Sequence, residues 1–375
     1  MRKDGQEMNS LTYAEQALFM LPKEVANGKV LVAGNRSGAF PLELLSRGLD
    51  VKIHVFDIHH FKAVRDRMNA AGASPVERLF CTPYVPEGPY DAAFFQTTPR
   101  SMSAELVLDQ LEDIHENLKD GGVLYASFEG DRDDALATVK KVFAKAGPVE
   151  LKPKEALTKY ELRGFERFKR HVTVFRCVRK GPLEKRRNFS ALWDASVPGD
   201  ETLKFESLPG CFCHRRVDAG GLALAEIACR EIKGGMKVVD MGSGCGLVGL
   251  LAAMHAKADG GVGLTLIDSH ARAVEASRRN ASRFGLDGVD FVLSDDGLNR
   301  KVVGEYDLFL GNPPYYSEYK IAETFISTAW RILKKGGVCL SVVKTATGLK
   351  ALQEKYFGKV DVIARRGYAV LRSVR

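Results

Sequence analysis

The sequence has no run of about 20 apolar residues, the length that a helix needs to span a bilayer. Near its first residue there is no apolar stretch followed by a small-residue cleavage site, so nothing there suggests secretion. Its seven cysteines are odd in number and scattered, which is typical of reduced thiols and not of a disulfide framework. We therefore expect a cytoplasmic protein without a membrane segment.

Metal-binding patterns are also scarce. Cys211-Phe-Cys213-His214 is the one cluster that resembles a ligand set. Structural zinc sites take four ligands, usually from two such clusters, and no second Cys/His pair stands nearby. We interpret Cys211 and Cys213 as buried thiols and expect no bound metal.

Positive charge is concentrated in one segment of the chain. The formal net charge is +8, and residues 151–187 alone hold thirteen Lys and Arg against four Glu, so the remainder is nearly neutral. Aromatic residues such as Phe168 and Phe175 stand between these charges, and this pattern favours a nucleic-acid partner over a merely solvated surface. The side chains that we expect to contact RNA are Lys169, Arg170, Arg176, Arg179, Lys185, Arg186 and Arg187.

A length of 375 residues is typical of two domains, and self-comparison shows two copies of one pattern. Four landmarks recur in the same order, and their offset stays between 208 and 216 residues. They pair residues 29–38 with 237–246, 51–57 with 262–268, 90–96 with 306–312, and 118–123 with 333–338. Four ordered matches with so little drift indicate an internal duplication.

Each copy alternates short apolar strands with amphipathic stretches, which is typical of βαβ units on a parallel sheet. The sequence therefore predicts an α/β fold of two tandem Rossmann-like domains, at residues 1–180 and 201–375. Residues 181–200, with Gly-Pro and Pro-Gly pairs near their ends, are the predicted linker. Ligand sites in such sheets lie beyond the carboxyl ends of the strands.

A glycine-rich turn opens the second copy. Asp240-Met-Gly242-Ser-Gly244-Cys-Gly246 stands between a predicted strand and a predicted helix, where glycines allow a ligand to approach backbone N–H groups closely. Leu247 replaces the third glycine of the dinucleotide motif, which disfavours NAD. Asp240, Gly242, Gly244 and Gly246 are therefore candidate cofactor-binding residues, and a purely structural turn is the alternative.

Two acids follow at the ends of the next predicted strands. Asp268 ends residues 262–268, where a carboxylate can accept hydrogen bonds from both ribose hydroxyls of an adenosine. Asp295 follows residues 289–293, where it can accept from an adenine amine. Each acid alone is typical of a helix cap, so the prediction depends on their order after the glycine turn.

The most specific element is Asn312-Pro313-Pro314-Tyr315, at the end of the fourth predicted strand. The proline rings restrict the backbone and hold the Asn312 side chain and the Pro313 carbonyl outward as two acceptors. Two accepted hydrogen bonds favour the pyramidal, reactive form of an exocyclic amine, and Tyr315 can stack on a base. These four are the candidate catalytic residues, and a turn capped by Asn312 is the alternative.

Together, the glycine turn, Asp268, Asp295 and the Asn-Pro-Pro-Tyr motif resemble class I methyltransferases that methylate amines. With the duplication, the chain resembles the bacterial rRNA guanine-N2 methyltransferases with tandem methyltransferase-like domains. Residues 208–220, with Pro-Gly-x-Phe and then Asp-x-Gly, are similar to the entry to that family's catalytic domain. The resemblance implies in-line transfer of the S-adenosylmethionine methyl group to guanine N2, with Asn312 also at the cofactor.

The resemblance also implies that the first domain is a degenerate copy that does not bind the cofactor. Val32 stands at the position of Asp240, and Arg36 stands at that of Gly244, where it would obstruct a cofactor. Gln96-Thr-Thr replaces the Asn-Pro-Pro of the second copy. We expect this half of the chain to recognise RNA.

Two alternatives stay open. Tyr315 stands where the family commonly has Phe, and Tyr is shared with adenine-N6 and protein-glutamine methyltransferases. A non-catalytic RNA-binding or ribosome-assembly factor that has kept the fold is the other. The expected partner is ribosomal RNA or a ribosomal subunit, and the expected state is a monomer.

Overall fold

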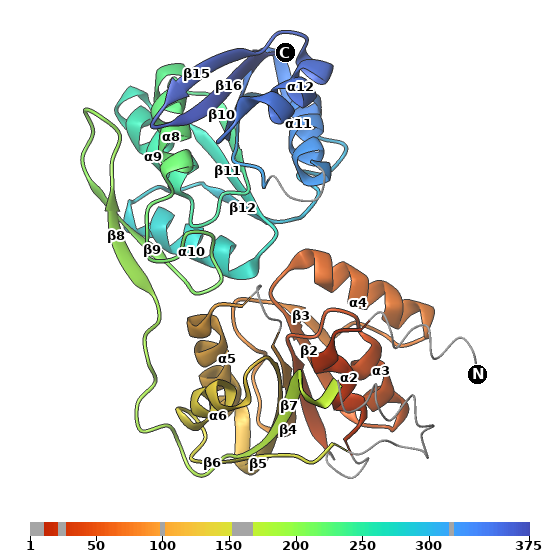
Figure 1. Cartoon of the computed structure of the whole chain (residues 1–375). Coiled ribbons are helices and arrows are strands. Elements are labelled where there is room, and N and C mark those ends of the chain that lie inside the picture. Colours follow the sequence, from red (N-terminus) through yellow and green to blue (C-terminus); the bar gives the residue numbers. More distant parts are fainter. Residues whose placement is uncertain (1–10, 22–27, 98–101, 152–167, 315–318) are drawn as a thin grey trace. The chain divides into compact units, whose positions relative to one another are not determined.

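The computed structural model describes residues 11–21, 28–97, 102–151, 168–314 and 319–375 (Figure 1). The chain forms two compact units, Met1–Phe189 and Ser190–Arg375. Each unit contains a seven-stranded sheet with helices packed on it, which confirms the predicted α/β fold class. Across the described ranges, we find no helix with the length and apolar character that crossing a membrane requires.

The sheet of the first unit has the strand order β3-β2-β1-β4-β5-β7-β6. Strands β1 to β5 pair in parallel, and β7 runs antiparallel to β5 and β6. The strands are β1 Lys29–Ala33, β2 Asp50–Val55, β3 Leu79–Cys81, β4 Tyr90–Gln96, β5 Leu118–Glu129, β6 Lys145–Pro148 and β7 Val172–Val178. The helices are α2 Tyr13–Phe19, α3 Ala39–Ser46, α4 Ile58–Ala70, α5 Ala104–Asn117 and α6 Arg132–Lys140.

The second unit repeats this topology strand for strand, in the order β12-β11-β10-β13-β14-β16-β15, and adds the antiparallel hairpin of β8 and β9. Its strands are β8 Ala191–Ala195, β9 Leu203–Ser207, β10 Lys237–Met241, β11 Gly263–Asp268, β12 Asp290–Leu293, β13 Tyr306–Gly311, β14 Leu333–Val343, β15 Asp361–Arg365 and β16 Tyr368–Val374. Its helices are α8 Ala219–Glu231, α9 Leu247–His255, η2 Ala256–Asp259, α10 Ala271–Arg283, α11 Lys320–Ile332 and α12 Ala346–Phe357.

Corresponding side chains make the same contacts in both units. In each seven-stranded sheet, a carboxylate at the start of the sheet's fourth strand in chain order accepts a hydrogen bond from the first backbone N–H of the sheet's first strand and one from a lysine ammonium. These sets are Asp91, Lys29 and Lys119 in the first unit and Asp307, Lys237 and Lys334 in the second. The duplication inferred from sequence therefore extends to individual hydrogen bonds.

Both faces of each sheet bury apolar side chains. Successive strand residues point to opposite faces. Val30 and Val32 of β1 accordingly belong to one apolar cluster, and Leu31 and Ala33 belong to another. Because both faces of each sheet are covered, polar side chains gather at the ends of the strands, where the loops begin.

The predicted linker, residues 181–200, differs from the structure. Part of this range is strand β8, in which Trp193 stacks on Phe205 of β9 with ring centroids 5.2 Å apart. Leu183, also in this range, packs on an apolar cluster of the first unit. The division between the units falls after residue 189, inside the predicted range 181–200.

Candidate active site

Strands of the second unit bring the predicted residues to one edge of the sheet. Met241 of β10 pairs in parallel with Ile267 of β11 and with Gly311 of β13. Asp268 pairs with Leu293 of β12. The glycine turn, Asp268, the turn with Asp295 and Asn312 stand at or just beyond these positions, at the carboxyl edge where parallel sheets bind ligands.

The glycine turn leads from β10 into α9 with positive φ at each of its glycines, 72° at Gly242, 58° at Gly244 and 85° at Gly246. A Cβ on Gly242 would lie 2.9 Å from the Phe325 ring, and one on Gly246 would lie 2.6 Å from Leu250. A Cβ on Gly244 would meet no atom within 4 Å. Gly242 and Gly246 are thus required by the protein's own packing, whereas Gly244 faces the open space that a ligand needs.

Asp240 lies beneath this turn. Its side chain is buried, and Oδ2 accepts a hydrogen bond of 2.9 Å from the backbone N–H of Gly249 in the first turn of α9. Burial raises the pKa of Asp240 to about 7, with the hydrogen bond from Gly249 acting in the opposite direction and the charge of Asp268 adding to the rise. The visible task of this predicted cofactor residue is to hold the start of α9.

Asp268 is joined directly to the turn. Its Oδ2 accepts from the backbone N–H of Gly244 at 2.9 Å, and its Oδ1 accepts from that of His270 at 2.9 Å. The backbone N–H of Ser294 donates to the Asp268 carbonyl at 2.9 Å, which brings the half-buried Asp295 beside this strand end. The two acids that the sequence predicted for adenosine are therefore neighbours.

Asn312 follows β13, and its Nδ2 donates to Oδ2 of Asp218 at 2.8 Å. Asp218 is the N-cap of α8, and the same oxygen accepts from the backbone N–H of Gly221 at 2.7 Å. Asp218 was not among the predicted site residues. Its place as a helix cap directly before Ala-Gly-Gly was the signal that could have identified it.

Pro313 is buried and Pro314 is half-buried directly after Asn312. The two prolines therefore lie at the carboxyl ends of the strands, at the same edge of the sheet as Gly244 and Asp268. Tyr315, the predicted stacking residue, lies outside the described residues.

In the first unit, side chains of the protein fill the corresponding turn. The buried carboxylate of Glu15 on α2 accepts from Asn35 Nδ2 at 2.9 Å, from the hydroxyl of Ser37 and from the backbone N–H of Phe40 at 3.3 Å. Asn35 also donates to Gln96 at 3.2 Å. A network of this kind, together with Arg36 at the position of Gly244, leaves the turn closed by its own residues.

The seven side chains predicted to contact RNA fall into two groups. Lys169 and Arg170 are exposed just before β7 begins, and the residues beyond its end lie about 20 Å away along the strand. At that far end, Arg179 donates to the Leu118 carbonyl. Arg186 pairs with Asp109 at 2.7 Å, and Arg187 pairs with Glu112, whose side chain is fully buried.

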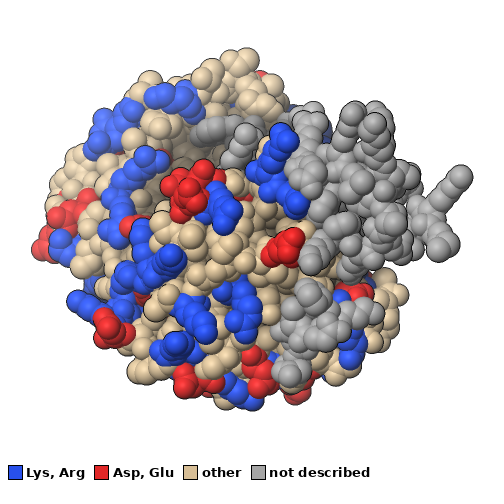
Figure 2. All heavy atoms as spheres, turned by 60° about the horizontal axis from the view of Figure 1, so that its bottom comes forward, with Lys and Arg blue, Asp and Glu red and all other residues tan. Residues whose placement is uncertain are grey.

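Arg179, Arg186 and Arg187 therefore hold the first unit together through these contacts. Arg176 in β7 and Lys185 are exposed, as are Lys169 and Arg170. Figure 2 shows Lys and Arg side chains gathered over the face that it brings forward, with fewer acidic side chains between them. Residues 152–167, which supply much of the basic segment, lie outside the described residues.

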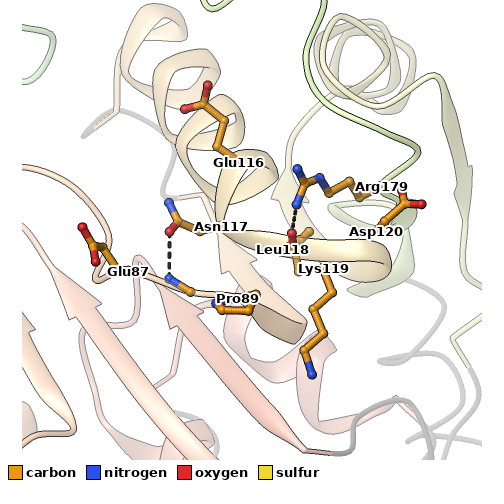
Figure 3. Close-up of a pocket in the computed structure, with 9 residues that line it drawn as sticks. Glu87, Pro89, Glu116, Asn117, Leu118, Lys119, Asp120 and Arg179 are labelled. Atoms are coloured by element: carbon orange, nitrogen blue, oxygen red, sulfur yellow. Dashed lines mark hydrogen bonds between the residues drawn. The ribbon is translucent and has the colours of Figure 1, made fainter.

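An open hollow of about 540 Å³ lies in the first unit, between the start of β4 and the junction of α5 with β5 (Figure 3). Its lining includes Lys119, paired with Asp91, and Arg179, which donates to Leu118. Arg375 makes the equivalent bond to the Leu333 carbonyl in the second unit. Since this hollow is at the amino edge of the strands and its cations repeat a structural contact, it is distinct from the predicted site.

Comparisons with known proteins agree with this division of the chain. Residues 202–372 match the family model of the methyltransferase small domain. The ribosomal RNA small subunit methyltransferase C of Salmonella arizonae is 35% identical over 202 residues, which is 52% of this chain and 56% of that protein. The protein of the same name from Cronobacter sakazakii is 32% identical over 201 residues, with the same coverage. The match thus spans little more than half the length of these relatives.

A solved structure resembles the whole chain. The T. thermophilus 16S rRNA N2 G1207 methyltransferase, in complex with AdoMet and guanosine, matches with a TM-score of 0.75 over 97% of this chain and 92% of that chain. The sequence identity is 18%, so the likeness concerns the fold. It covers both units and supports the tandem Rossmann-like architecture.

Proposed function

We propose that this chain, whose residues 202–372 match the methyltransferase small domain, is an S-adenosylmethionine-dependent methyltransferase that modifies guanine N2 in ribosomal RNA. The observation that carries the proposal is the convergence of Gly244, Asp268 and Asn312 on one sheet edge of the second unit. The names of the relatives, and the guanosine bound in the structural neighbour, support the same class of substrate.

The residues at this edge fit the cofactor. The open space at Gly244 is a cradle that any side chain would fill, and the Asp268 carboxylate beside it accepts from the Gly244 N–H. Asp268 and Asp295, which follows in the adjoining turn, are the proposed acceptors for the ribose hydroxyls and the adenine amine. When bound, S-adenosylmethionine supplies an electrophilic methyl group on a sulfonium. The chain supplies the alignment.

Asn312 is the residue that selects an amine as the group to be methylated. Because Nδ2 of Asn312 is engaged by Asp218, its Oδ1 is the atom left to accept from a substrate N–H. The Pro313 carbonyl is the second acceptor of the proposal, and Tyr315 supplies stacking on the base. Two acceptors draw the amine lone pair out of conjugation and toward the methyl group, so catalysis rests on positioning and needs no strong base. A base in RNA has to leave its stack to reach this edge.

The first unit serves as an RNA-recognition domain in this proposal. Glu15 is hydrogen-bonded to Asn35 and to the Phe40 N–H at the turn of the first unit, and Arg36 stands where the second unit has Gly244, so we propose that this unit does not bind the cofactor. Lys169 and Arg170, exposed before β7, are the proposed phosphate contacts, because neutralising phosphates supplies sequence-independent affinity.

The experiment that tests the substrate class is methyl transfer from radiolabelled S-adenosylmethionine to separated acceptors. Small-subunit rRNA, assembled small subunits and a ribosomal protein fraction are offered in parallel. We expect label in rRNA, free or assembled. Label in protein alone would favour the protein-glutamine reaction, and label in none of the three would overturn the proposal.

A further inference from the structure

A group of three metal-ligand side chains lies in the second unit away from Asn312. Asp200, Cys229 and His255 each offer one ligand atom, and these atoms all lie within 4.8 Å of one another. In the part of the chain that the structure describes, no other group of three His, Cys, Asp or Glu residues meets this condition. Neither the methyl-transfer chemistry nor the packing of the glycine turn uses these three residues.

Three separate elements bring the side chains together. Asp200 lies in the connection between β8 and β9, Cys229 lies in the last turn of α8, and His255 is the last residue of α9. Helices α8 and α9 end just before β10 and β11 begin, so the cluster is at the amino edge of the sheet (Figure 1). Asn312 and Gly244 are at the opposite, carboxyl edge, which assigns the cluster a role separate from catalysis.

The donor set matches one class of cation. A thiolate with an imidazole is typical of Zn²⁺ and similar borderline-soft ions, whereas Mg²⁺ and Ca²⁺ take oxygen ligands. Ligand atoms around a tetrahedral Zn²⁺, at bonds of about 2.0–2.3 Å, stand roughly 3.3–3.6 Å apart. Atoms already within 4.8 Å therefore reach a common ion by small side-chain rotations. Three protein ligands leave a fourth position for water.

An ordinary surface ion pair does not explain the arrangement fully. Nδ1 of His255 lies 2.8 Å from Oδ2 of Asp200, and both side chains are partly exposed, so this contact alone adds little stability. The pair does not require a cysteine, yet the Cys229 sulfur, from helix α8, lies within 4.8 Å of the ligand atoms of both residues. A cation shared by all three would use each donor.

We propose that Asp200, Cys229 and His255 bind a zinc-class divalent cation that fastens the β8–β9 hairpin to the ends of α8 and α9. The hairpin already contributes Val197 and Phe205 to the apolar core that α8 and α9 share. A bound ion would add a polar clamp at the edge of that core. With three protein ligands and one open position, this site differs from the closed four-ligand structural zinc sites. Its place at the ends of the strands opposite the predicted cofactor residues separates it from methyl transfer.

The other cysteine cluster of this unit supplies a matched control. Cys211 donates to the Arg272 carbonyl at 3.4 Å, and His214 is hydrogen-bonded to Ser207 at 3.0 Å, so those side chains have different partners. Cys213→Ser therefore changes a half-buried cysteine of the same unit outside the proposed site.

The test is titration of the chelator-treated full chain with Co²⁺ and then Zn²⁺. We expect one equivalent of Co²⁺ with a thiolate-to-cobalt charge-transfer band, displacement by Zn²⁺, and a melting temperature several degrees higher with Zn²⁺. Cys229→Ser should abolish the band, and His255→Asn should lower the affinity at least tenfold, while Cys213→Ser keeps both. A band lost in Cys213→Ser but kept in Cys229→Ser, or no saturable binding by wild type, would overturn the proposal.

Discussion

The Asp218 carboxylate fixes the orientation of the Asn312 amide. Nδ2 of Asn312 lies 2.8 Å from Oδ2 of Asp218, and that oxygen also accepts from Gly221 at the start of α8. An ionised carboxylate only accepts hydrogen bonds, so the amide presents its N–H to Asp218 and keeps its carbonyl oxygen for another donor. The two residues are 94 positions apart in sequence and link the start of α8 to the end of β13.

Asp218→Ser separates the orienting role from the capping role. Serine caps a helix about as well as aspartate, so we expect the melting temperature to stay near that of wild type. A hydroxyl can donate as well as accept, so the amide of Asn312 is no longer held one way and kcat should fall by up to about 100-fold. KM for S-adenosylmethionine should change little. A large loss of stability with unchanged kcat would assign Asp218 a structural role only.

We predict that the glycine turn of the second unit binds the cofactor and that the corresponding turn of the first unit does not. Gly244→Arg places a long side chain in the open space beside Asp268, so calorimetry should detect no S-adenosylmethionine binding. Arg36→Gly should create no second site, because Glu15 and Asn35 still fill the turn of the first unit. We expect one binding equivalent in wild type and in Arg36→Gly. Two equivalents in either would contradict the closed first turn.

Asp240 should make the stability of the second unit depend on pH. Burial raises its pKa to about 7 from an ordinary value of 3.8, so the folded state binds this proton more tightly than the unfolded state does. Its contribution to stability is therefore complete below about pH 4 and is lost as pH rises through about 7. Asp240→Asn removes this titration and keeps an oxygen that can accept from Gly249.

The measurement for Asp240 is urea unfolding of both chains across pH 4 to 8. The free energy of unfolding of Asp240→Asn minus that of wild type should rise by on the order of 2–4 kcal/mol from pH 4 to pH 8. The rise should level off above about pH 7. Taking the difference between the two proteins cancels the pH dependence that comes from the carboxylates they share. A constant difference would show that Asp240 does not titrate in this range.

Lys169 and Arg170 test RNA contact by the first unit. Changing both to Gln should weaken binding to rRNA and lower the slope of log affinity against log salt by up to about 1.4, at roughly 0.7 for each single-strand phosphate contact. Lys140→Gln with Lys141→Gln removes the same charge from an exposed pair at the end of α6. Equal effects of the two double variants would point to general attraction and not to a defined contact.

The duplicated fold could be predicted because the pattern was local and repeated. Four landmarks kept their order, and each became the same element in both sheets. The predicted linker contains the division between the units, but strand β8 within it was not predicted. The Pro-Gly pair at 198–199 belongs to the connection between β8 and β9, which pair with each other and in which Trp193 stacks on Phe205. Stacking across a hairpin leaves no signal in the spacing of turn residues.

The site was predictable where residues follow their strands directly. Gly244, Asp268 and Asn312 met at one edge because parallel strands end together. The roles of Asp218 and Glu15 were not predicted, because they depend on contacts with residues distant in sequence, Asn312 and Asn35. In its described part the basic segment is divided, since Lys169 and Arg170 precede β7 whereas Arg186 and Arg187 pair with acids of α5. Its contact with RNA stays a prediction.

The central claim is tested most directly by identifying the methylated nucleoside that wild type and Asn312→Ala each produce. Small-subunit rRNA is incubated with S-adenosylmethionine and either wild type or Asn312→Ala, digested to nucleosides and quantified by mass spectrometry. We predict N2-methylguanosine from wild type and a rate lower by at least about 100-fold for Asn312→Ala, with similar cofactor affinity, since the lost interaction belongs to the transition state. N6-methyladenosine as the product, or an equal rate from both chains, would contradict the account.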